Sequence, residues 1–262
     1  MNLNIIFENS DILVLDKPSG LIVNRAETTK EETLQDQLAE YFQLKSGDFG
    51  IGERAGIVHR LDRETSGVLV IAKTQKAFIY MQNEFKERRV KKEYAALVHG
   101  RLREKSGVIK SRIARIGKFG RFGNLKEREI GGRESETDFE LVSSYQYPDF
   151  SLEKIAQDSG YNKSRLRYLG KNALDYSLLS VFPKTGRTHQ IRVHLKSIGH
   201  PVVSDSIYAP SKLLKFDLLW CPRLFLHAKS ISFSDPKSKK ILNFKSDLPN
   251  ELKNAMLFLT IS

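Results

Sequence analysis

An unbroken apolar run, Val68–Ala72, bounded by Gly67 and Lys73, is the strongest constraint on how this chain can fold. Its length and its bounds predict a buried β-strand. The nine residues from His59 to Gly67 contain a histidine, two arginines, two acids, a threonine and a serine. So many polar side chains directly before a strand that must be buried indicate that they have a functional role.

The charge balance indicates a polyanionic partner. Among 262 residues, 43 Lys and Arg stand against 31 Asp and Glu, which gives a net charge of +12. Such an excess favours binding to RNA, DNA or an anionic membrane surface, although a merely soluble basic protein would also fit. The chain is large enough to bury a sizeable core, because 40% of its residues are hydrophobic and 15 are Phe.

Several classes of protein are excluded by what the sequence lacks. No apolar run approaches the ~20 residues that span a bilayer, and the first residues show neither a basic start nor a small-residue cleavage site. A single cysteine, Cys221, allows no internal disulfide and no cysteine-based zinc site. We therefore expect a reducing, cytoplasmic location and no membrane association.

Strands and helices are expected to alternate irregularly, without the regular βαβ rhythm of a doubly wound fold. Two capping boxes, Thr28 and Thr29 each with Glu three residues later, predict that a helix follows. An amphipathic segment, 76–89, predicts a second helix with Phe78, Met81 and Phe85 facing inward. The pattern favours a mixed α+β fold.

A polar segment, 145–173, lies between two predicted strands, 137–143 and 176–181, and is a candidate insertion. Ser151 as N-cap and Gly160 as stop predict one short helix inside it. The glycine-rich stretch 117–123, "GKFGRFG", is typical of a turn or a hairpin tip.

The second informative stretch is "TGRTHQIRVHLKSIGHP", 185–201. Thr188 can cap a helix that Gly199 ends. Ile191, Leu195 and Ile198 would form one apolar face of this helix. The helix would also carry a basic stripe of three side chains: His189, Arg192 and Lys196. A solvated charged face is the simplest interpretation of such a stripe when it is taken alone.

Several chemistries can be tested against these residues. His189 and His194 are five positions apart and diverge on a helix, so they do not hold one metal ion together. Ser66 lacks the nucleophile-elbow pattern, and the glycines of 117–123 lack the ending of a phosphate loop. Chemistry based on a carboxylate is the remaining possibility, and Asp62 and Glu64 are the candidate residues. A paired-acid glycosidase would need a second, well-spaced acid that the sequence does not identify.

Five segments, in one order along the chain, carry distinctive motifs: "DILVLDKPSGLIV", "HRLDRETSGVLVIAKT", "KKEYAALVHG", "TGRTHQIRVHL" with "GHPVVSDSIY", and "RLFLHA" with Asp235-Pro236 and "SDLPNEL". Together they resemble the RluA-type RNA pseudouridine synthases. The second segment matches the catalytic signature of that family, His-Arg-Leu-Asp followed by x-x-Thr-Ser-Gly.

The resemblance implies one catalytic domain over 1–262, with 145–173 as an insertion and no separate N-terminal RNA-binding domain. It also implies the pseudouridine synthase fold, in which a mixed, largely antiparallel central sheet is divided by a catalytic cleft and flanked by helices. The sequence departs from the family at Ser204, where a Gly is usual before Asp, and in the length of 145–173.

The family's reaction converts a uridine in RNA to its carbon-linked isomer without oxidation or addition, so no cofactor and no metal are expected. Carried over by motif, Asp62 would be the carboxylate nucleophile and Arg192 the cation that keeps it ionised. Tyr94 would stack on the uracil. We expect the Asp62 and Arg192 side chains within salt-bridge reach, roughly 4 Å, and a lowered pKa for Asp62.

A stacked uridine must leave its helix to reach a buried carboxylate, and Arg60 resembles the family residue that fills the vacated space. His59, His189 and His227 are expected to be hydrogen-bonded structural groups rather than general bases. Basic stretches mixed with aromatic residues suit phosphate contacts and stacking. The predicted RNA-binding residues are Arg60, His59, Arg88, Arg89, Lys91, Lys92, Lys118, Arg121, Arg187 and His189.

The sequence therefore predicts an enzyme that isomerises specific uridines of structured ribosomal or transfer RNA, acting as a monomer with RNA as its partner. Two alternatives remain open at this point. One is a non-catalytic RNA-binding or RNA-folding protein on the same fold. The other is a carboxylate-dependent hydrolase of glycosidic bonds.

Overall fold

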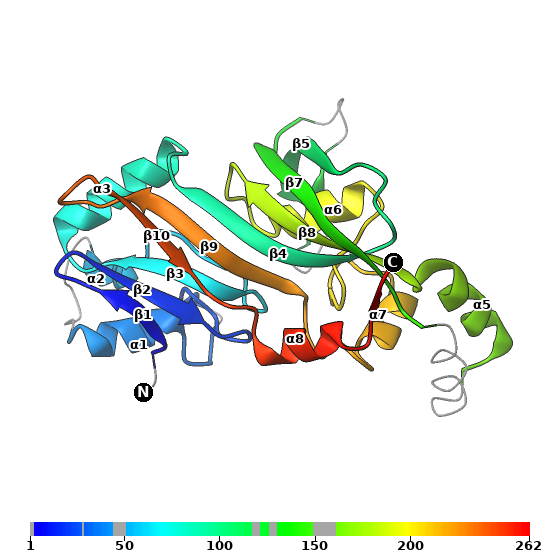
Figure 1. Ribbon diagram of the computed structural model, residues 1–262. Coiled ribbons are helices and arrows are strands. Elements are labelled where there is room, and N and C mark those ends of the chain that lie inside the picture. The colour runs from blue at the N-terminus through cyan, green and yellow to red at the C-terminus, as the bar shows by residue number, and fades with distance from the viewer. Residues whose placement is uncertain (1–2, 28, 44–50, 117–120, 126–129, 149–160) are drawn as a thin grey trace. The chain divides into compact units, whose positions relative to one another are not determined.

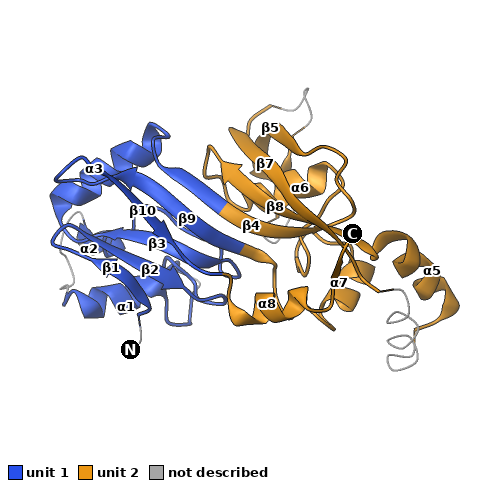
Figure 2. Ribbon diagram, viewed as in Figure 1, with its two compact units in different colours: residues 1–93, 227–247 blue, residues 94–226, 248–262 orange. Residues whose placement is uncertain are grey.

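The computed structural model describes residues 3–27, 29–43, 51–116, 121–125, 130–148 and 161–262 (Figure 1). The chain divides into two compact units (Figure 2). Unit 1 contains residues 1–93 and 227–247, and unit 2 contains residues 94–226 and 248–262. Both units are discontinuous in sequence, because the chain leaves unit 1 within strand β4 and returns to it within β9.

The described residues of unit 1 form a mixed sheet and the helices α1, α2 and α3. Its strands follow the order β1-β2-β3-β9, with β10 paired to β9. The β3–β9 pair is parallel, and the pairs β1–β2, β2–β3 and β9–β10 are antiparallel. The elements are β1 (Ile5–Glu8), β2 (Ile12–Lys17), α1 (Leu34–Tyr41), α2 (Ile51–Arg54), β3 (Ser66–Ala72), α3 (Gln75–Lys86), the start of β4 (Lys91–His99), β9 (Leu226–Ser234) from His227 on, and β10 (Ile241–Lys245).

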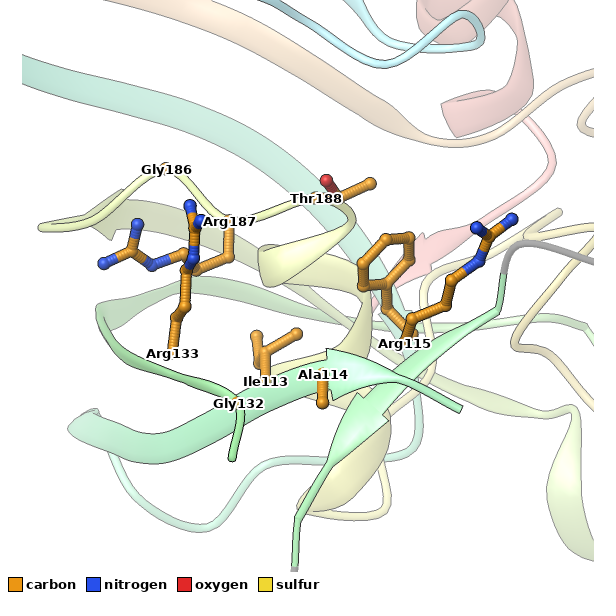
Figure 3. Close-up of a pocket in the computed structure, with 9 residues that line it drawn as sticks. Ile113, Ala114, Arg115, Gly132, Arg133, Gly186, Arg187 and Thr188 are labelled. Atoms are coloured by element: carbon orange, nitrogen blue, oxygen red, sulfur yellow. The ribbon is translucent and has the colours of Figure 1, made fainter. Parts of the chain in front are cut away.

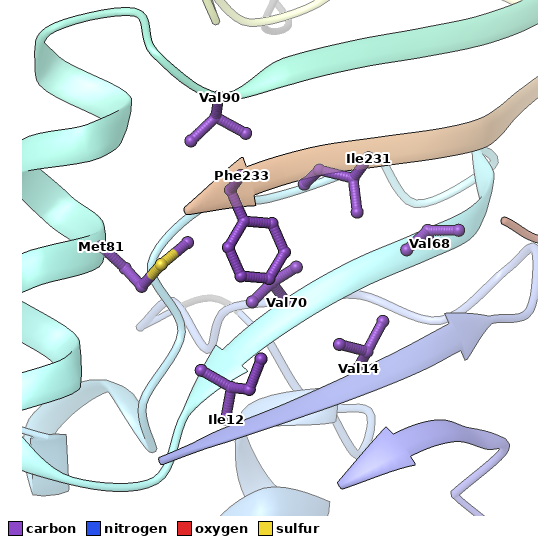
Figure 4. Packing of buried hydrophobic residues seen from close by; sticks show 8 residues of the cluster. All are labelled: Ile12, Val14, Val68, Val70, Met81, Val90, Ile231 and Phe233. Atoms are coloured by element: carbon purple, nitrogen blue, oxygen red, sulfur yellow. The ribbon is translucent and has the colours of Figure 1, made fainter. Parts of the chain in front are cut away.

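Strand β3 is the predicted buried strand, and all seven of its residues are buried. Its side chains meet those of β2, β9 and α3 in one apolar cluster (Figure 4). The cluster consists of Ile12, Val14, Val68, Val70, Met81, Val90, Ile231 and Phe233. The polar residues that precede β3 are thus attached to the buried core of unit 1.

Gly67 is where β3 meets β9 in parallel, opposite Ala228. Its φ is +115°, and a Cβ there would lie 2.3 Å from the backbone oxygen of Ala228. Only glycine allows this close approach. The Ser-Gly step of the signature is therefore needed to bring β9 alongside the start of β3.

Unit 2 is built on an antiparallel sheet in the order β4-β8-β7-β5-β6, with β11 paired to β7. Helix α6 lies against this sheet and contacts β5, β6, β7 and β8. The elements are β4 from Tyr94 on, β5 (Ser106–Arg115), β6 (Phe122–Asn124), β7 (Arg133–Gln146), α5 (Lys163–Asn172), β8 (Asp175–Pro183), α6 (Gln190–Ser197), α7 (Ser211–Asp217), α8 (Asn250–Met256) and β11 (Thr260–Ile261).

The predicted α+β class with a mixed, largely antiparallel sheet is confirmed by this topology. The inward face of the second helix is also confirmed, since α3 buries Phe78 and Met81 and packs Phe85 partly against the core. The helix ends at Lys86 and not at Arg89. The cap of the first helix was predicted wrongly. Helix α1 begins after Thr33, whose side chain forms a reciprocal capping box with Asp36. The catalytic cleft stays a prediction.

Two further predictions fail at α6. His189, and not Thr188, is the N-cap, and it holds a left-handed φ of 55° without a side-chain cap. Ile198 is 39% exposed instead of joining the apolar face. The helix predicted for 151–160 lies outside the described residues.

Candidate active site

The polar loop before β3 is held in place by the turn that follows β2. Lys17 is only 1% exposed, and its Nζ donates to the carbonyl oxygens of Pro18 (2.7 Å), Leu21 (2.9 Å) and Arg63 (3.1 Å). The backbone N–H of Gly20 donates to the same Arg63 oxygen at 2.8 Å. A buried ammonium group that is satisfied by three carbonyl oxygens fixes the backbone next to Asp62.

Asp62 itself is half-buried at the first position of a tight turn. The N–H of Thr65 donates to the carbonyl oxygen of Asp62 at 3.1 Å, which closes the turn. On the other side, Ser19 Oγ donates to the Glu64 carbonyl at 2.7 Å. Hydrogen bonds therefore hold the backbone of this loop on both sides of Asp62.

His59 has a structural role: it binds the backbone of strand β3 and is not a catalytic group. The backbone N–H of Val70 donates to His59 Nε2 at 3.0 Å, so this nitrogen carries no proton. The ring stacks on Phe85 with centroids 4.6 Å apart. Burial of the ring, together with the nearby Lys92 ammonium, lowers the pKa of His59 to about 3. The imidazole is a neutral structural acceptor at physiological pH.

His227 anchors the first residue of β3. Its Nε2 lies 3.1 Å from the carbonyl oxygen of Ser246 and must donate to it, because a carbonyl only accepts. In the neutral ring, Nδ1 then accepts from Ser66 Oγ, which lies 2.9 Å away. Both Ser66 and His227 are buried. This chain of hydrogen bonds agrees with the expectation that His227 is structural.

Arg192 is buried in unit 2, with 2% of its surface exposed. Its Nε and Nη2 donate to the two carboxylate oxygens of Asp205, each at 2.8 Å. Asp205 is fully buried and also accepts the N–H groups of Ile207 (2.9 Å) and Tyr208 (3.0 Å). Arg192 is thus not part of a solvated face, because a bidentate ion pair orients its guanidinium, whereas Lys196 is exposed.

Tyr94 is buried on β4, directly opposite Val181 of β8. It belongs to unit 2 together with Arg192, whereas Asp62 belongs to unit 1. The expected salt bridge between Asp62 and Arg192, with Tyr94 beside it, therefore stays a prediction.

Sequence analysis missed two groups that support the site. Asp205 lies in the segment "SDSIY", whose acid had no assigned role. His194 belongs to α6 and is hydrogen-bonded through both ring nitrogens: Nδ1 lies 2.8 Å from Thr137 Oγ1, and Nε2 lies 2.9 Å from both Ser111 Oγ and Ser135 Oγ. Burial lowers the pKa of His194 to about 4, so this network holds a neutral ring.

The predicted RNA-binding residues differ in their surroundings. Arg60, Arg88 and Lys91 are exposed. Arg89 pairs with Glu84 at 2.8 Å, which raises the pKa of Arg89. Burial lowers the pKa of Lys92 to about 8.

The remaining predicted contacts lie in unit 2. Arg121 Nη2 donates to the Ile207 carbonyl at 2.5 Å, and Arg187 Nε donates to the Glu134 carbonyl at 3.1 Å. His189 Nδ1 lies 2.8 Å from the Tyr208 hydroxyl. Lys118 lies outside the described residues.

Within the described ranges, no helix has the length and the apolar character needed to cross a membrane. Over the same ranges, no three His, Cys, Asp or Glu side chains gather where they could hold a metal ion.

Known proteins resemble this chain in sequence over almost its whole length. A ribosomal large subunit pseudouridine synthase D of Nitrosomonas europaea is 34% identical over 253 residues, which is 95% of this chain and 63% of the relative. The family model described as RNA pseudouridylate synthase matches residues 11–197. This chain belongs to the RluA-type RNA pseudouridine synthases.

Other relatives of this synthase agree. An uncharacterized RNA pseudouridine synthase of Bacillus subtilis, YlyB, is 31% identical over 257 residues, which is 96% of this chain and 71% of the relative. Among solved structures, human RNA pseudouridylate synthase domain containing 1 has a TM-score of 0.70 at 26% identity, covering 100% of this chain and 89% of that one.

The departure of this synthase at Ser204 has a local explanation. Ser204 has a φ of 56°, a backbone conformation that glycine adopts most easily. Its Oγ donates to the Cys221 carbonyl at 2.6 Å, and its N–H donates to Asp217 Oδ2 at 3.0 Å. These bonds offset the strain, so the neighbouring Asp205 keeps its position with serine at 204.

Proposed function

We propose that this synthase uses Asp62 as the nucleophile, Arg192 as the cation that keeps it ionised, and Tyr94 as the ring that stacks on the target uracil. The observation that carries the proposal is the half-buried Asp62 at the first position of a turn that Lys17 and Ser19 hold from the neighbouring segment. A nucleophile placed on a rigid turn loses little entropy when it reacts.

The proposed chemistry balances without a cofactor. The bond between N1 of the uracil and C1′ of the ribose breaks, the base rotates, and C5 bonds to C1′. The proton on C5 leaves, and N1 is protonated. Asp62 supplies the electron pair for a transient covalent bond and recovers it at the end.

Arg192 would support Asp62 through the part of its guanidinium that Asp205 does not engage. Asp205 accepts from Nε and from one N–H of Nη2, so the proposed pairing with Asp62 uses Nη1 or the second N–H of Nη2. Asp205 is then a positioning residue, because it fixes the plane of the guanidinium.

We further propose that the substrate is ribosomal RNA of the large subunit, acted on in the cytoplasm by a monomer. Two relatives, from Nitrosomonas europaea and Zymomonas mobilis, carry the name ribosomal large subunit pseudouridine synthase D. The net charge of +12 suits a polyanion of this kind. Transfer RNA is the alternative substrate.

The test is to map pseudouridines in ribosomal and transfer RNA from cells with and without the gene. A site in large-subunit RNA that is lost with the gene, and restored by the wild-type protein but not by Asp62→Asn, supports the proposal. Loss confined to transfer RNA would overturn the choice of substrate.

A further inference from the structure

A cavity of about 400 Å³ lies within unit 2, apart from the residues proposed for catalysis (Figure 3). Its walls come from the end of β5, from β6, from the start of β7 and from the turn before α6. Nine residues line it: Ile113, Ala114, Arg115, Phe122, Gly132, Arg133, Gly186, Arg187 and Thr188. Three of these are arginines and none is acidic.

Two of the arginines lie together. Figure 3 shows the side chains of Arg133 and Arg187 beside each other at one end of the cavity, with Arg115 at the other end. Within the part of the chain that the structure describes, no carboxylate forms an ion pair with any of the three. Neighbouring guanidinium groups repel each other, and a bound anion would offset that repulsion.

Two acidic side chains of β7 are paired with lysines. Glu136 pairs with Lys110 at 3.2 Å, and Asp138 pairs with Lys184 at 2.9 Å. Neither of these two carboxylates lines the cavity, whose lining contains three arginines and no acid.

Arg187 is held in position before any ligand arrives. Its Nε donates to the Glu134 carbonyl at 3.1 Å, and its backbone N–H donates to Gln190 Oε1 at 3.0 Å. A guanidinium that is fixed through Nε presents its two Nη groups as a fork, which matches the oxygens of a phosphate.

The apolar part of the lining limits what can bind. Ile113, Ala114 and Phe122 give the cavity a hydrophobic wall, and its volume is far larger than a single phosphate needs. Arginines beside an aromatic ring are typical of sites that hold one nucleotide of a single-stranded segment through its phosphate and its base.

We propose that this cavity binds one nucleotide of the RNA substrate, outside the isomerisation site, with its phosphodiester on Arg133 and Arg187. The cavity ends at Thr188, four positions before Arg192. The bound nucleotide is therefore a neighbour of the target uridine rather than the target itself. This proposal rests on the proposed function, because it takes RNA as the substrate.

The test measures binding of a short fluorescein-labelled RNA composed only of adenosine, by fluorescence anisotropy over a range of salt concentrations. This RNA contains no uridine, so the result does not depend on whether the protein isomerises anything. The double variant Arg133→Gln/Arg187→Gln is expected to lose affinity on the order of tenfold. Its slope of log affinity against log salt is expected to fall by about 0.7 for each lost phosphate contact.

A matched double variant, Arg101→Gln/Arg103→Gln, removes the same charge from exposed positions of the same unit. If it loses as much affinity as the cavity variant, the cavity is not the site. If the cavity variant fails to fold, the exposed Arg133→Gln alone must still weaken binding more than Arg101→Gln. Competition by free adenosine 5′-monophosphate at the same concentration as the RNA would also overturn the proposal, since it would indicate a site for free nucleotides.

Discussion

Replacing Asp205 by Asn should destabilise unit 2 and lower activity together, because it removes the counter-charge of a buried arginine. Asp205 accepts from Nε and Nη2 of Arg192 at 2.8 Å and from two backbone N–H groups. Both side chains are at most 3% exposed, so water cannot replace what is lost. In the variant, the amide N–H₂ would also face a guanidinium N–H, and two donors cannot bond.

The expected cost follows from this burial. Breaking a buried pair by removing one partner costs about 3–5 kcal/mol, since an uncompensated charge remains. For a chain of this size that corresponds to a lowering of the melting temperature on the order of 10 °C. Asp138→Asn is the matched control. Asp138 and its partner Lys184 are 31% and 49% exposed, so the loss of that pair costs roughly 0–1 kcal/mol.

Urea unfolding followed by tryptophan fluorescence suits this comparison. Trp220 is the single tryptophan of the chain, belongs to unit 2 and is 4% exposed. It packs against Tyr147 and Tyr176 with ring centroids 5.8 and 5.3 Å apart. If Asp205→Asn loses no more stability than Asp138→Asn, the pair does not hold Arg192 in the way argued above.

Three further predictions concern pH, salt and metals. The folded protein lowers the pKa values of His59 and His194 from 6.5 to about 3 and about 4. Below pH 6.5 the unfolded chain therefore binds more protons than the folded protein. The free energy of unfolding should be highest above pH 6.5 and should fall as the pH decreases toward 4, by about 1.4 kcal/mol per pH unit for each ring. Urea unfolding at several pH values checks this, and an unchanged slope in His194→Gln would contradict it. RNA affinity should fall steeply with salt, and Arg88→Gln with Lys91→Gln should flatten that dependence; equal slopes would place the RNA elsewhere. Exhaustive chelation should leave pseudouridine formation unchanged, and activity restored only by an added metal would oppose this.

Local patterns predicted the elements whose stability is local. The apolar run at β3 and the helical period of apolar residues in α3 are sufficient to predict these two elements, because burial follows directly from the order of apolar residues. The N-cap residue of the first helix is harder to predict, because several threonines qualify. Thr28, Thr29 and Thr33 each precede a suitable acid, and the helix begins where Asp36 closes the box.

Local sequence patterns could not predict contacts between residues that are far apart in the chain. The basic stripe of α6 indicated a solvated face, because nothing within the helix shows that Asp205, in a later loop, takes the charge of Arg192. Arg133 and Arg187 lie 54 positions apart in the chain, and they line one cavity only because β7 and the turn before α6 fold together. The family motifs identified the candidate site through its residues, whereas its hydrogen-bonded support became visible only in the structure.

The most direct test of the central claim uses RNA that carries tritium at carbon 5 of uridine. Formation of the new carbon–carbon bond releases that hydrogen to water, and the isomer is then identified by mass spectrometry after chemical labelling. Wild-type protein is expected to release tritium and form pseudouridine, whereas Asp62→Asn should do neither while binding RNA within a few-fold of wild type. Substantial turnover by Asp62→Asn would contradict the assignment of Asp62 as the nucleophile.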